Sequence, residues 1–353
     1  MSGRGGQDWR RLDESDVRVR PSRGSRPRSK RRPDHADATS ALVARVDRGR
    51  WTCALDGDPE REVVAMRARE LGRTPVVVGD RVDLVGDTSG RRDALARIVR
   101  VAERTSVLRR TADDTDPYER VVVANAEQLV IVSALADPPP RTGFIDRCLV
   151  AAYAGGLAPL LCLTKADLAA ADELIAAYAE LDLAIVVTRF DAEPDELRAA
   201  VRNRVSAFVG HSGVGKSTLV NALVPGAAQL TASVSAVGKG RHTSITAIAL
   251  PLPEGGWVVD TPGIRSFGLA HITATDIVSA FDEFAPLAEE CPPGCEHLGE
   301  HIGEQIRGQI GPREEADCML DTAVAAGVAS AGRLASLRRL LMSRAGAEDL
   351  ANQ

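Results

Sequence analysis

The residues from Gly210 to Ser217 carry the strongest chemical signal in the chain. They match the pattern G-x-x-x-x-G-K-[ST], whose glycines let backbone N–H groups close around phosphates. Lys216 is expected to reach the β- and γ-phosphates, and the Ser217 hydroxyl to bind Mg²⁺. An apolar stretch precedes the motif and a helical pattern follows it, as a strand–loop–helix phosphate site requires. The residues predicted to surround the phosphates are Gly210, His211, Ser212, Gly213, Val214, Gly215, Lys216, Ser217 and Thr218.

A second motif, Thr164-Lys165-Ala166-Asp167, follows an apolar stretch and matches the base-reading pattern [NT]-K-x-D. The Asp167 carboxylate can accept hydrogen bonds from the ring N–H and the exocyclic amine of guanine, a donor pair that adenine lacks. The stem of Lys165 would pack along the base. In isolation such a tetrapeptide is more often a charged loop at a sheet edge. Beside a phosphate loop, it predicts guanine nucleotide binding.

A third motif begins at Asp260, after the apolar residues 257–259, and ends at Gly263. The aspartate suits a water-mediated contact to Mg²⁺, and the Gly263 N–H is placed to sense the γ-phosphate. In most GTPases the base motif follows the phosphate loop, whereas here it precedes it, so the order is circularly permuted. The segment after Gly263 therefore runs directly into the C-terminal region, which loss of the γ-phosphate could move.

Residues 238–246 occupy the place of the first switch loop. Thr243, rather than Ser244, is the preferred candidate to complete the Mg²⁺ shell. Ile264 stands where many GTPases carry a water-orienting Gln, and an Ile side chain cannot orient water. We therefore predict slow intrinsic turnover and a catalytic group from elsewhere, with His242 as the nearest candidate besides Lys216. The alternative is that His242 is a structural residue of the loop.

A cluster of metal-binding side chains follows near the C-terminus. Cys291, Cys295 and His297 lie within seven residues, and Cys318 comes later. Three thiolates and one imidazole suit a closed, structural Cys₃His zinc site. The long gap before Cys318 leaves His301 as a competing fourth ligand, and a set of free thiols is the remaining alternative.

The sequence predicts a cytoplasmic protein. No apolar run approaches the length of about 18 residues that a membrane span needs, and the N-terminus lacks the apolar core of a signal peptide. Six cysteines are too few for a disulfide scaffold, so most are expected to be reduced. Cys148 and Cys162 lie in apolar runs and are expected in the core. Residues 1–33 are rich in arginine, glycine, serine and proline, which predicts a mobile arm. The arm either contacts RNA phosphates or only keeps the chain soluble.

Two patterns of strands predict two folds. Short alternating strands with close turns predict a small, OB-like β-barrel, with strands at 41–46, 51–55, 75–78, 81–85 and 96–101 and a turn at Gly79-Asp80. Near-continuous apolar strands separated by helices predict an α/β P-loop domain with a parallel sheet covered on both faces, with strands at 129–133, 160–163, 184–187 and 205–209. The remainder is expected to be mostly helical around the Cys/His cluster.

These patterns divide the chain into four parts. We predict a basic disordered arm at 1–37, an OB-like barrel at 38–112, a circularly permuted GTPase domain at 113–270 and a helical zinc-binding domain at 271–353.

Together these features resemble the RsgA (YjeQ) family of ribosome small-subunit-dependent GTPases. Besides the base and D-x-x-G motifs, the matching stretches are 78–82, 124–128, 145–149, 210–217 and 240–243. The resemblance implies an OB domain, a permuted GTPase domain and a zinc-binding domain. It carries the catalytic role to His242 and the zinc roles to Cys291, Cys295, His297 and Cys318. The chain departs from the family in its cysteine spacing, in a longer segment at 298–317, in a second base element reduced to 187–189 and in Leu337 at a late tyrosine position.

The resemblance also implies a role in late assembly of the small ribosomal subunit. The barrel and zinc domains would grip 16S rRNA, the subunit would stimulate GTP hydrolysis, and GTP hydrolysis to GDP would release the factor while assembly factors leave. A monomer is the expected state. Two alternatives stay open: a P-loop ATPase or kinase acting on a small molecule, and a nucleotide-gated RNA-binding module with little hydrolysis.

Overall fold

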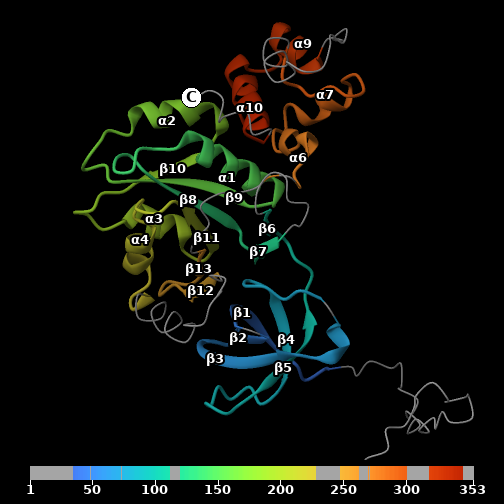
Figure 1. Cartoon of the computed structure of the whole chain (residues 1–353), viewed down its shortest axis with the longest axis vertical. Coiled ribbons are helices and arrows are strands. Elements are labelled where there is room, and N and C mark those ends of the chain that lie inside the picture. Colours follow the sequence, from blue (N-terminus) through green and yellow to red (C-terminus); the bar gives the residue numbers. More distant parts are fainter. Residues whose placement is uncertain are drawn as a thin grey trace, which may run out of the picture. The chain divides into compact units, whose positions relative to one another are not determined.

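The computed structural model describes residues 35–47, 49–72, 74–111, 120–227, 247–261, 269, 271–299 and 318–344 (Figure 1). The predicted arm lies outside these ranges except for its last residues. The predicted domain boundaries near 112 and 270 also fall outside them, so these boundaries stay predictions.

The first described strands form a closed barrel. Their order is β1-β2-β3-β5-β4, and a further pairing of β1 with β4 closes the ring. The predicted barrel is therefore confirmed. Alternate residues of each strand fill its interior, among them Val43, Cys53 and Ile98. The strands are β1 (Thr39–Asp47), β2 (Arg50–Leu55), β3 (Asp58–Arg67), β4 (Arg81–Gly86) and β5 (Ala96–Val101).

Two details of the barrel differ from the sequence prediction. Strand β3 has no predicted counterpart, because its first half is charged and exposed and only Val63 and Ala65 are buried. The predicted strand at 75–78 forms no strand. Two of its backbone groups bond to side chains: the Val77 N–H donates to the Asp80 carboxylate at 2.8 Å, and the Trp51 indole donates to the Val76 carbonyl at 3.0 Å.

Two of the family-matching stretches meet where the barrel joins the next domain. The Ala124 N–H donates to the Val78 carbonyl at 2.9 Å, and the Asn125 amide donates to the Gly79 carbonyl at 3.0 Å. A Cβ at Gly79 would collide with the Ala124 carbonyl oxygen, so this approach requires glycine. These backbone contacts hold residues 78–79 and 124–125 together and leave no room for a side chain at position 79.

The α/β domain that follows the barrel is built on a mostly parallel sheet. Its order is β10-β9-β8-β11-β13-β12, with β12 the antiparallel member, and a single residue pair between β12 and β1 joins it to the barrel sheet. A hairpin of β6 (Val107–Arg110) and β7 (Arg120–Ala124) precedes it. The strands are β8 (Gln128–Ala134), β9 (Ala158–Thr164), β10 (Ala184–Val187), β11 (Val205–Gly210), β12 (Ile248–Pro251) and β13 (Trp257–Asp260).

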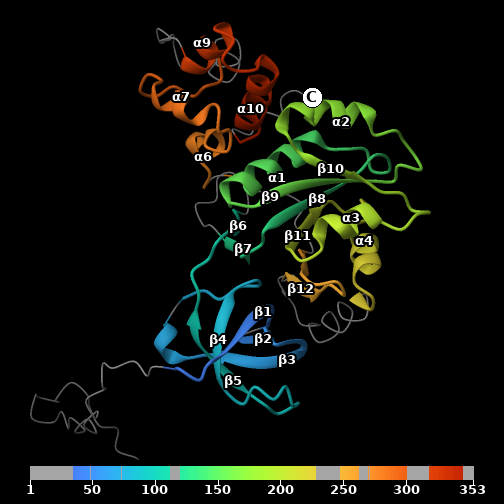
Figure 2. The ribbon, with the colours of Figure 1, turned by 180° about the vertical axis from the view of Figure 1, so that it is seen from behind.

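Helices cover both faces of this sheet, as predicted. Helices α1 (Thr142–Ala154) and α2 (Asp172–Tyr178) lie on one face, and α3 (Asp195–Val201) and α4 (Lys216–Leu223) on the other (Figures 1 and 2). Successive residues of each strand point to opposite faces. Ile131 accordingly packs in one apolar core and its neighbour Val132 in the other.

The region after the sheet is helical, also as predicted. It contains α6 (Ala274–Val278), α7 (Ala285–Glu289), α9 (Met319–Ala325) and α10 (Ala331–Arg344). Leu337, which replaces a tyrosine of the family, is fully buried in the same apolar core as α1. Within the described ranges, none of the helices has the length and apolar character needed to cross a membrane.

Two adjacent arginines of α10 contact different parts of the chain. Arg338 donates to the His297 carbonyl at 3.0 Å, within the Cys/His cluster. Arg339 pairs with Asp146 of α1 at 3.1 Å, where the Asp146 side chain is only 1% exposed. Helix α10 therefore joins the Cys/His cluster to the α/β domain.

Arg339→Met is expected to lower the free energy of unfolding by about 3 kcal/mol, because it leaves the Asp146 carboxylate buried without its cation. The methionine keeps an apolar stem of similar length. Urea denaturation of the full chain measures the loss. The double variant Asp146→Leu with Arg339→Met should recover most of it, since it removes both charges. A single variant as stable as the wild type would show that the ion pair contributes nothing.

Candidate nucleotide-binding site

The topology of the sheet brings the nucleotide motifs together. From β8 the chain proceeds through β9 to β10 in one direction, and then crosses to β11 on the other side of β8. Ligands of open α/β sheets bind at such a switch point, beyond the carboxyl ends of the strands. The base motif follows β9 and the phosphate loop follows β11, so both lie beside the end of β8.

The phosphate loop has the backbone that its glycines predict. Gly215 adopts a φ of +91° and precedes the first turn of α4, so its conformation favours glycine. A Cβ on Gly210 would lie 2.7 Å from the Val132 carbonyl oxygen, so β8 and β11 approach closely where the loop begins. Lys216, Ser217 and Thr218 form the first turn of α4, whose N-terminal N–H groups favour an anion.

The base motif and the phosphate loop are bonded to each other. The Thr164 hydroxyl donates to the Val214 carbonyl at 2.6 Å, and Thr164 is only 4% exposed. This bond couples the position of the base-reading loop to the position of the phosphate loop.

Thr164→Val is expected to weaken GDP binding by about 5- to 10-fold, since a buried hydrogen bond contributes about 1 kcal/mol and its loss leaves the Val214 carbonyl unsatisfied. Valine keeps the shape of the side chain. Isothermal titration calorimetry measures the change, with Thr188→Val as a matched control, because the Thr188 hydroxyl bonds within the base-reading loops, to the Leu163 carbonyl. Unchanged GDP affinity in Thr164→Val would show that the two motifs act independently.

A loop after β8 completes this side of the site. The Lys165 ammonium donates to the Asp137 carbonyl, and Pro138 Cδ lies 3.5 Å from where a Cβ of Gly213 would be. This loop has no counterpart in the sequence prediction. The signal that could have found it is the Asp-Pro-Pro-Pro run at 137–140, directly after an apolar strand.

The Asp167 carboxylate is held by a neighbouring loop. Its Oδ1 accepts the Phe190 backbone N–H at 3.1 Å. Two backbone bonds fasten that loop to the base motif, from Thr188 to the Leu163 carbonyl at 2.7 Å and from Ala166 to the Thr188 carbonyl at 3.2 Å. Because the two carboxylate oxygens together can accept about four hydrogen bonds, this one bond leaves Asp167 able to accept those of a base.

The predicted phosphate-binding lysine and magnesium-binding aspartate lie together. The Lys216 ammonium and the Asp260 carboxylate form an ion pair whose side chains are each 11% exposed. Asp260 ends β13, directly beside the phosphate-loop strand β11. The sheet thus brings together two groups that are 44 residues apart in sequence.

His211 of the phosphate loop packs against α1. Its ring lies 4.2 Å from that of Phe144, with an angle of 56° between the ring planes. The remaining predicted residues, His242, Thr243 and Gly263, lie outside the described residues, as do Ser244 and Ile264. Their roles stay predictions.

The predicted zinc ligands converge. Three sulfur atoms surround the His297 Nδ1, at 3.5 Å for Cys291, 3.5 Å for Cys295 and 3.7 Å for Cys318. Tetrahedral zinc with bonds of about 2.3 Å to sulfur places neighbouring sulfurs about 3.8 Å apart, and the Cys291 and Cys318 sulfurs are 3.9 Å apart. The four residues therefore fit one zinc ion. The competing candidate His301 lies outside the described residues.

The other cysteines are core residues. Cys53, Cys148 and Cys162 are buried, and burial raises the pKa of Cys53 and Cys162 to about 12. Such thiols are unreactive at neutral pH, which agrees with the predicted core role of Cys148 and Cys162.

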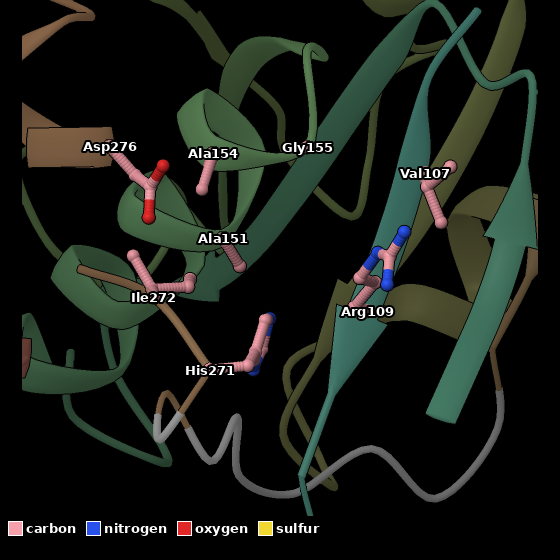
Figure 3. A pocket seen from close by; sticks show the side chains of 8 residues that line it. All are labelled: Val107, Arg109, Ala151, Ala154, Gly155, His271, Ile272 and Asp276. Carbon is pink, nitrogen blue, oxygen red and sulfur yellow. The ribbon is translucent and has the colours of Figure 1, made fainter. Parts of the chain in front are cut away.

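A separate pocket of about 180 Å³ lies at the other end of α1 from His211 (Figure 3). Arg109 of β6 lies on one side, the last turn of α1 on another, and the segment from His271 to Asp276 on a third. This is where the chain enters the C-terminal region after the D-x-x-G motif.

Known proteins resemble this chain over most of its length. The profile of the family described as RsgA GTPase matches residues 101–270. The small ribosomal subunit biogenesis GTPase RsgA of Gemmatimonas aurantiaca is 37% identical over 87% of this chain and 99% of its own length. The protein of the same name from Chlorobaculum parvum is 36% identical over 80% of this chain and 95% of its own length.

Solved structures share the fold. YjeQ from Thermotoga maritima aligns with a TM-score of 0.60 and 25% identity, over 88% of this chain and 99% of its own. YloQ, described as a circularly permuted GTPase, aligns with a TM-score of 0.61 over 90% of this chain and 98% of its own, at 18% identity. With a permuted motif order, a shared fold and more than a third of its residues identical to a full-length relative, the chain belongs to the RsgA GTPase family.

Proposed function

We propose that this protein is a GTPase that acts in biogenesis of the small ribosomal subunit, with hydrolysis stimulated by the subunit and coupled to release from it. The observation that carries the proposal is the bond from Thr164 to the phosphate loop, which joins a guanine-reading motif and a triphosphate-binding loop in one site. The partner is inferred from the similarity to proteins named small ribosomal subunit biogenesis GTPases.

Each group of the site has a proposed role. Thr164, Lys165 and Asp167 hold the guanine, residues 210–218 surround the phosphates, and Lys216 neutralises charge on the β- and γ-phosphates. Mg²⁺ would be held by the Ser217 and Thr243 hydroxyls, with Asp260 acting through water, and would neutralise charge on the same phosphates. Lys216 then exchanges its pairing with Asp260 for the triphosphate.

Hydrolysis needs a group that orients or deprotonates water. Ile264 cannot do so, and we propose His242 for this role, with the Gly263 N–H sensing the γ-phosphate. Because hydrolysis is slow without such a group in place, the small subunit would accelerate it by fixing the switch segments.

Release follows from the order of the motifs. The segment after Asp260 leads into the helical C-terminal region, which α10 fastens to the GTPase domain through Arg339 and Asp146. Loss of the γ-phosphate would shift this region and weaken its grip, together with that of the barrel and the basic arm, on 16S rRNA. We further propose that the protein is a cytoplasmic monomer and that assembly factors leave at the same step.

The test is steady-state hydrolysis of GTP and ATP by the full chain, with and without purified small ribosomal subunits. The expected result is slow, GTP-specific turnover that rises many-fold with subunits. His242→Ala should keep GDP affinity and lose the stimulated rate. GTP-specific turnover that does not change with small subunits would refute the ribosomal partner and retain the proposed GTPase activity. No hydrolysis in either condition would favour a nucleotide-gated RNA-binding module, and equal use of ATP a different P-loop enzyme.

A further inference from the structure

Phe190 is the most exposed large apolar side chain in the described part of the chain, at 84%. The other described phenylalanines, Phe144, Phe208, Phe281 and Phe284, are all buried. A single exposed apolar residue needs no explanation by itself. The position of Phe190 is what makes its exposure informative.

The backbone fixes Phe190 next to the base-reading carboxylate. Its N–H donates to Asp167 Oδ1 at 3.1 Å. Two residues earlier, the Thr188 N–H donates to the Leu163 carbonyl near the end of β9 at 2.7 Å. Because its own backbone N–H bonds to Asp167, Phe190 lies next to the carboxylate that is proposed to bind the base. Position 190 directly follows the stretch 187–189, where the sequence departs from the family's second base element.

A guanine held through its edge by Asp167 still presents two flat faces. The stem of Lys165 is available for one, because Lys165 has a φ of +60° and its ammonium is fixed on the Asp137 carbonyl. The other face requires a flat apolar partner, and aromatic rings stack on bases with substantial affinity. Among the described aromatic residues, Phe190 is the one whose backbone N–H bonds to Asp167.

We propose that the ring of Phe190 stacks on the purine and so supplies nucleotide affinity that is independent of base identity. This inference rests on the proposed GTPase function. It divides the work of the two loops: Asp167 discriminates guanine by hydrogen bonds to its edge, and Phe190 holds the face of the ring. The second base element of this chain is reduced to residues 187–189, and the stacking contact would compensate for the contacts to the base that this element lacks.

Phe190→Ala separates the two roles, because alanine keeps the backbone N–H that holds Asp167. Titration calorimetry with GDP and Mg²⁺ is expected to show affinity on the order of 10-fold weaker than wild type. IDP, whose base lacks the exocyclic amine but offers the same face, should lose affinity by the same factor. The matched control is Val328→Ala, another exposed apolar residue at 72%, which should change neither value.

A second variant keeps the proposal testable by a direct signal. Phe190→Trp should bind GDP within about threefold of wild type, and its added fluorescence, measured against wild-type protein, should be quenched by GDP as the indole stacks on the purine.

Three results would overturn the proposal. GDP affinity of Phe190→Ala within twofold of wild type would exclude a stack. Loss of GDP but not IDP affinity would mean that Phe190 acts only by orienting Asp167. Unchanged GDP affinity with weakened binding to small subunits would assign the ring to a macromolecular surface. Failure of wild-type protein to bind GDP would instead contradict the proposed function.

Discussion

Asp167→Asn is expected to lower affinity for GDP by roughly 100-fold or more and to create affinity for XDP. The carboxylate accepts two hydrogen bonds from guanine, and bonds to a charged group contribute about 1.5–3 kcal/mol each. An asparagine amide offers one acceptor and one donor. It therefore leaves the exocyclic amine of guanine facing another donor, whereas xanthine presents a carbonyl there. Titration calorimetry with GDP, XDP and ADP measures the change.

The substitution Asp167→Asn should change the contacts to the base without disturbing the position of the loop. Asparagine retains an oxygen that can accept the Phe190 N–H, the bond that holds residue 167 at 3.1 Å. The control is Asp191→Asn, because Asp191 is an exposed carboxylate one residue beyond Phe190 that pairs with Arg189. Its variant should bind GDP as the wild type does. If Asp167→Asn kept wild-type preference for GDP over XDP, another residue would have to read the base.

Cys318→Ser is expected to abolish stoichiometric zinc and to unfold the region around α7 and α9. Purified without chelators, the wild type should contain one zinc per chain, since three thiolates and one imidazole converge on one point. Structural zinc contributes on the order of 10 kcal/mol to folding of such small regions. Elemental analysis gives the metal content, and hydrogen exchange locates the loss of structure.

The effect should be confined to the C-terminal region. Cys318 directly precedes α9, whereas the nucleotide motifs follow β9, β11 and β13, so GDP affinity should persist in the variant. Cys53→Ala, which removes a buried thiol in the barrel, should keep its zinc. Wild-type protein without zinc would refute the metal site and leave the cluster as a set of free thiols.

Sequence patterns predicted elements well where local chemistry selects the structure. The strand at 205–209 and the phosphate loop were predictable because an apolar run, two glycines and a lysine permit few other backbones. Strand β3 was not predictable. Its residues Pro59 to Glu62 are exposed and three of the four are charged. The strand forms because β2 pairs with Asp58 and with Glu62 to Ala65, and β5 pairs with Ala65 to Arg67.

The same division holds within the site. Residue types alone predicted which groups bind a base, a phosphate and a metal, because each chemistry accepts few side chains. The contacts that join these groups depend on the sheet order, since β8 lies between β9 and β11. That order places Thr164 against Val214 and, because β13 lies beside β11, Lys216 against Asp260. The packing of the helical region after the sheet places Cys318 against His297.

The coupling between domains also came from the tertiary structure. Asp146 and Arg339 are ordinary charged residues 193 positions apart, and nothing in their local sequence pairs them. The pairing depends on burial. When α10 packs on α1, the Asp146 carboxylate is buried, and a buried charge requires a partner such as Arg339. The binding residues could be predicted from short motifs because they depend on residue type and spacing. The coupling between domains could not, because it depends on which distant surfaces the fold brings into contact.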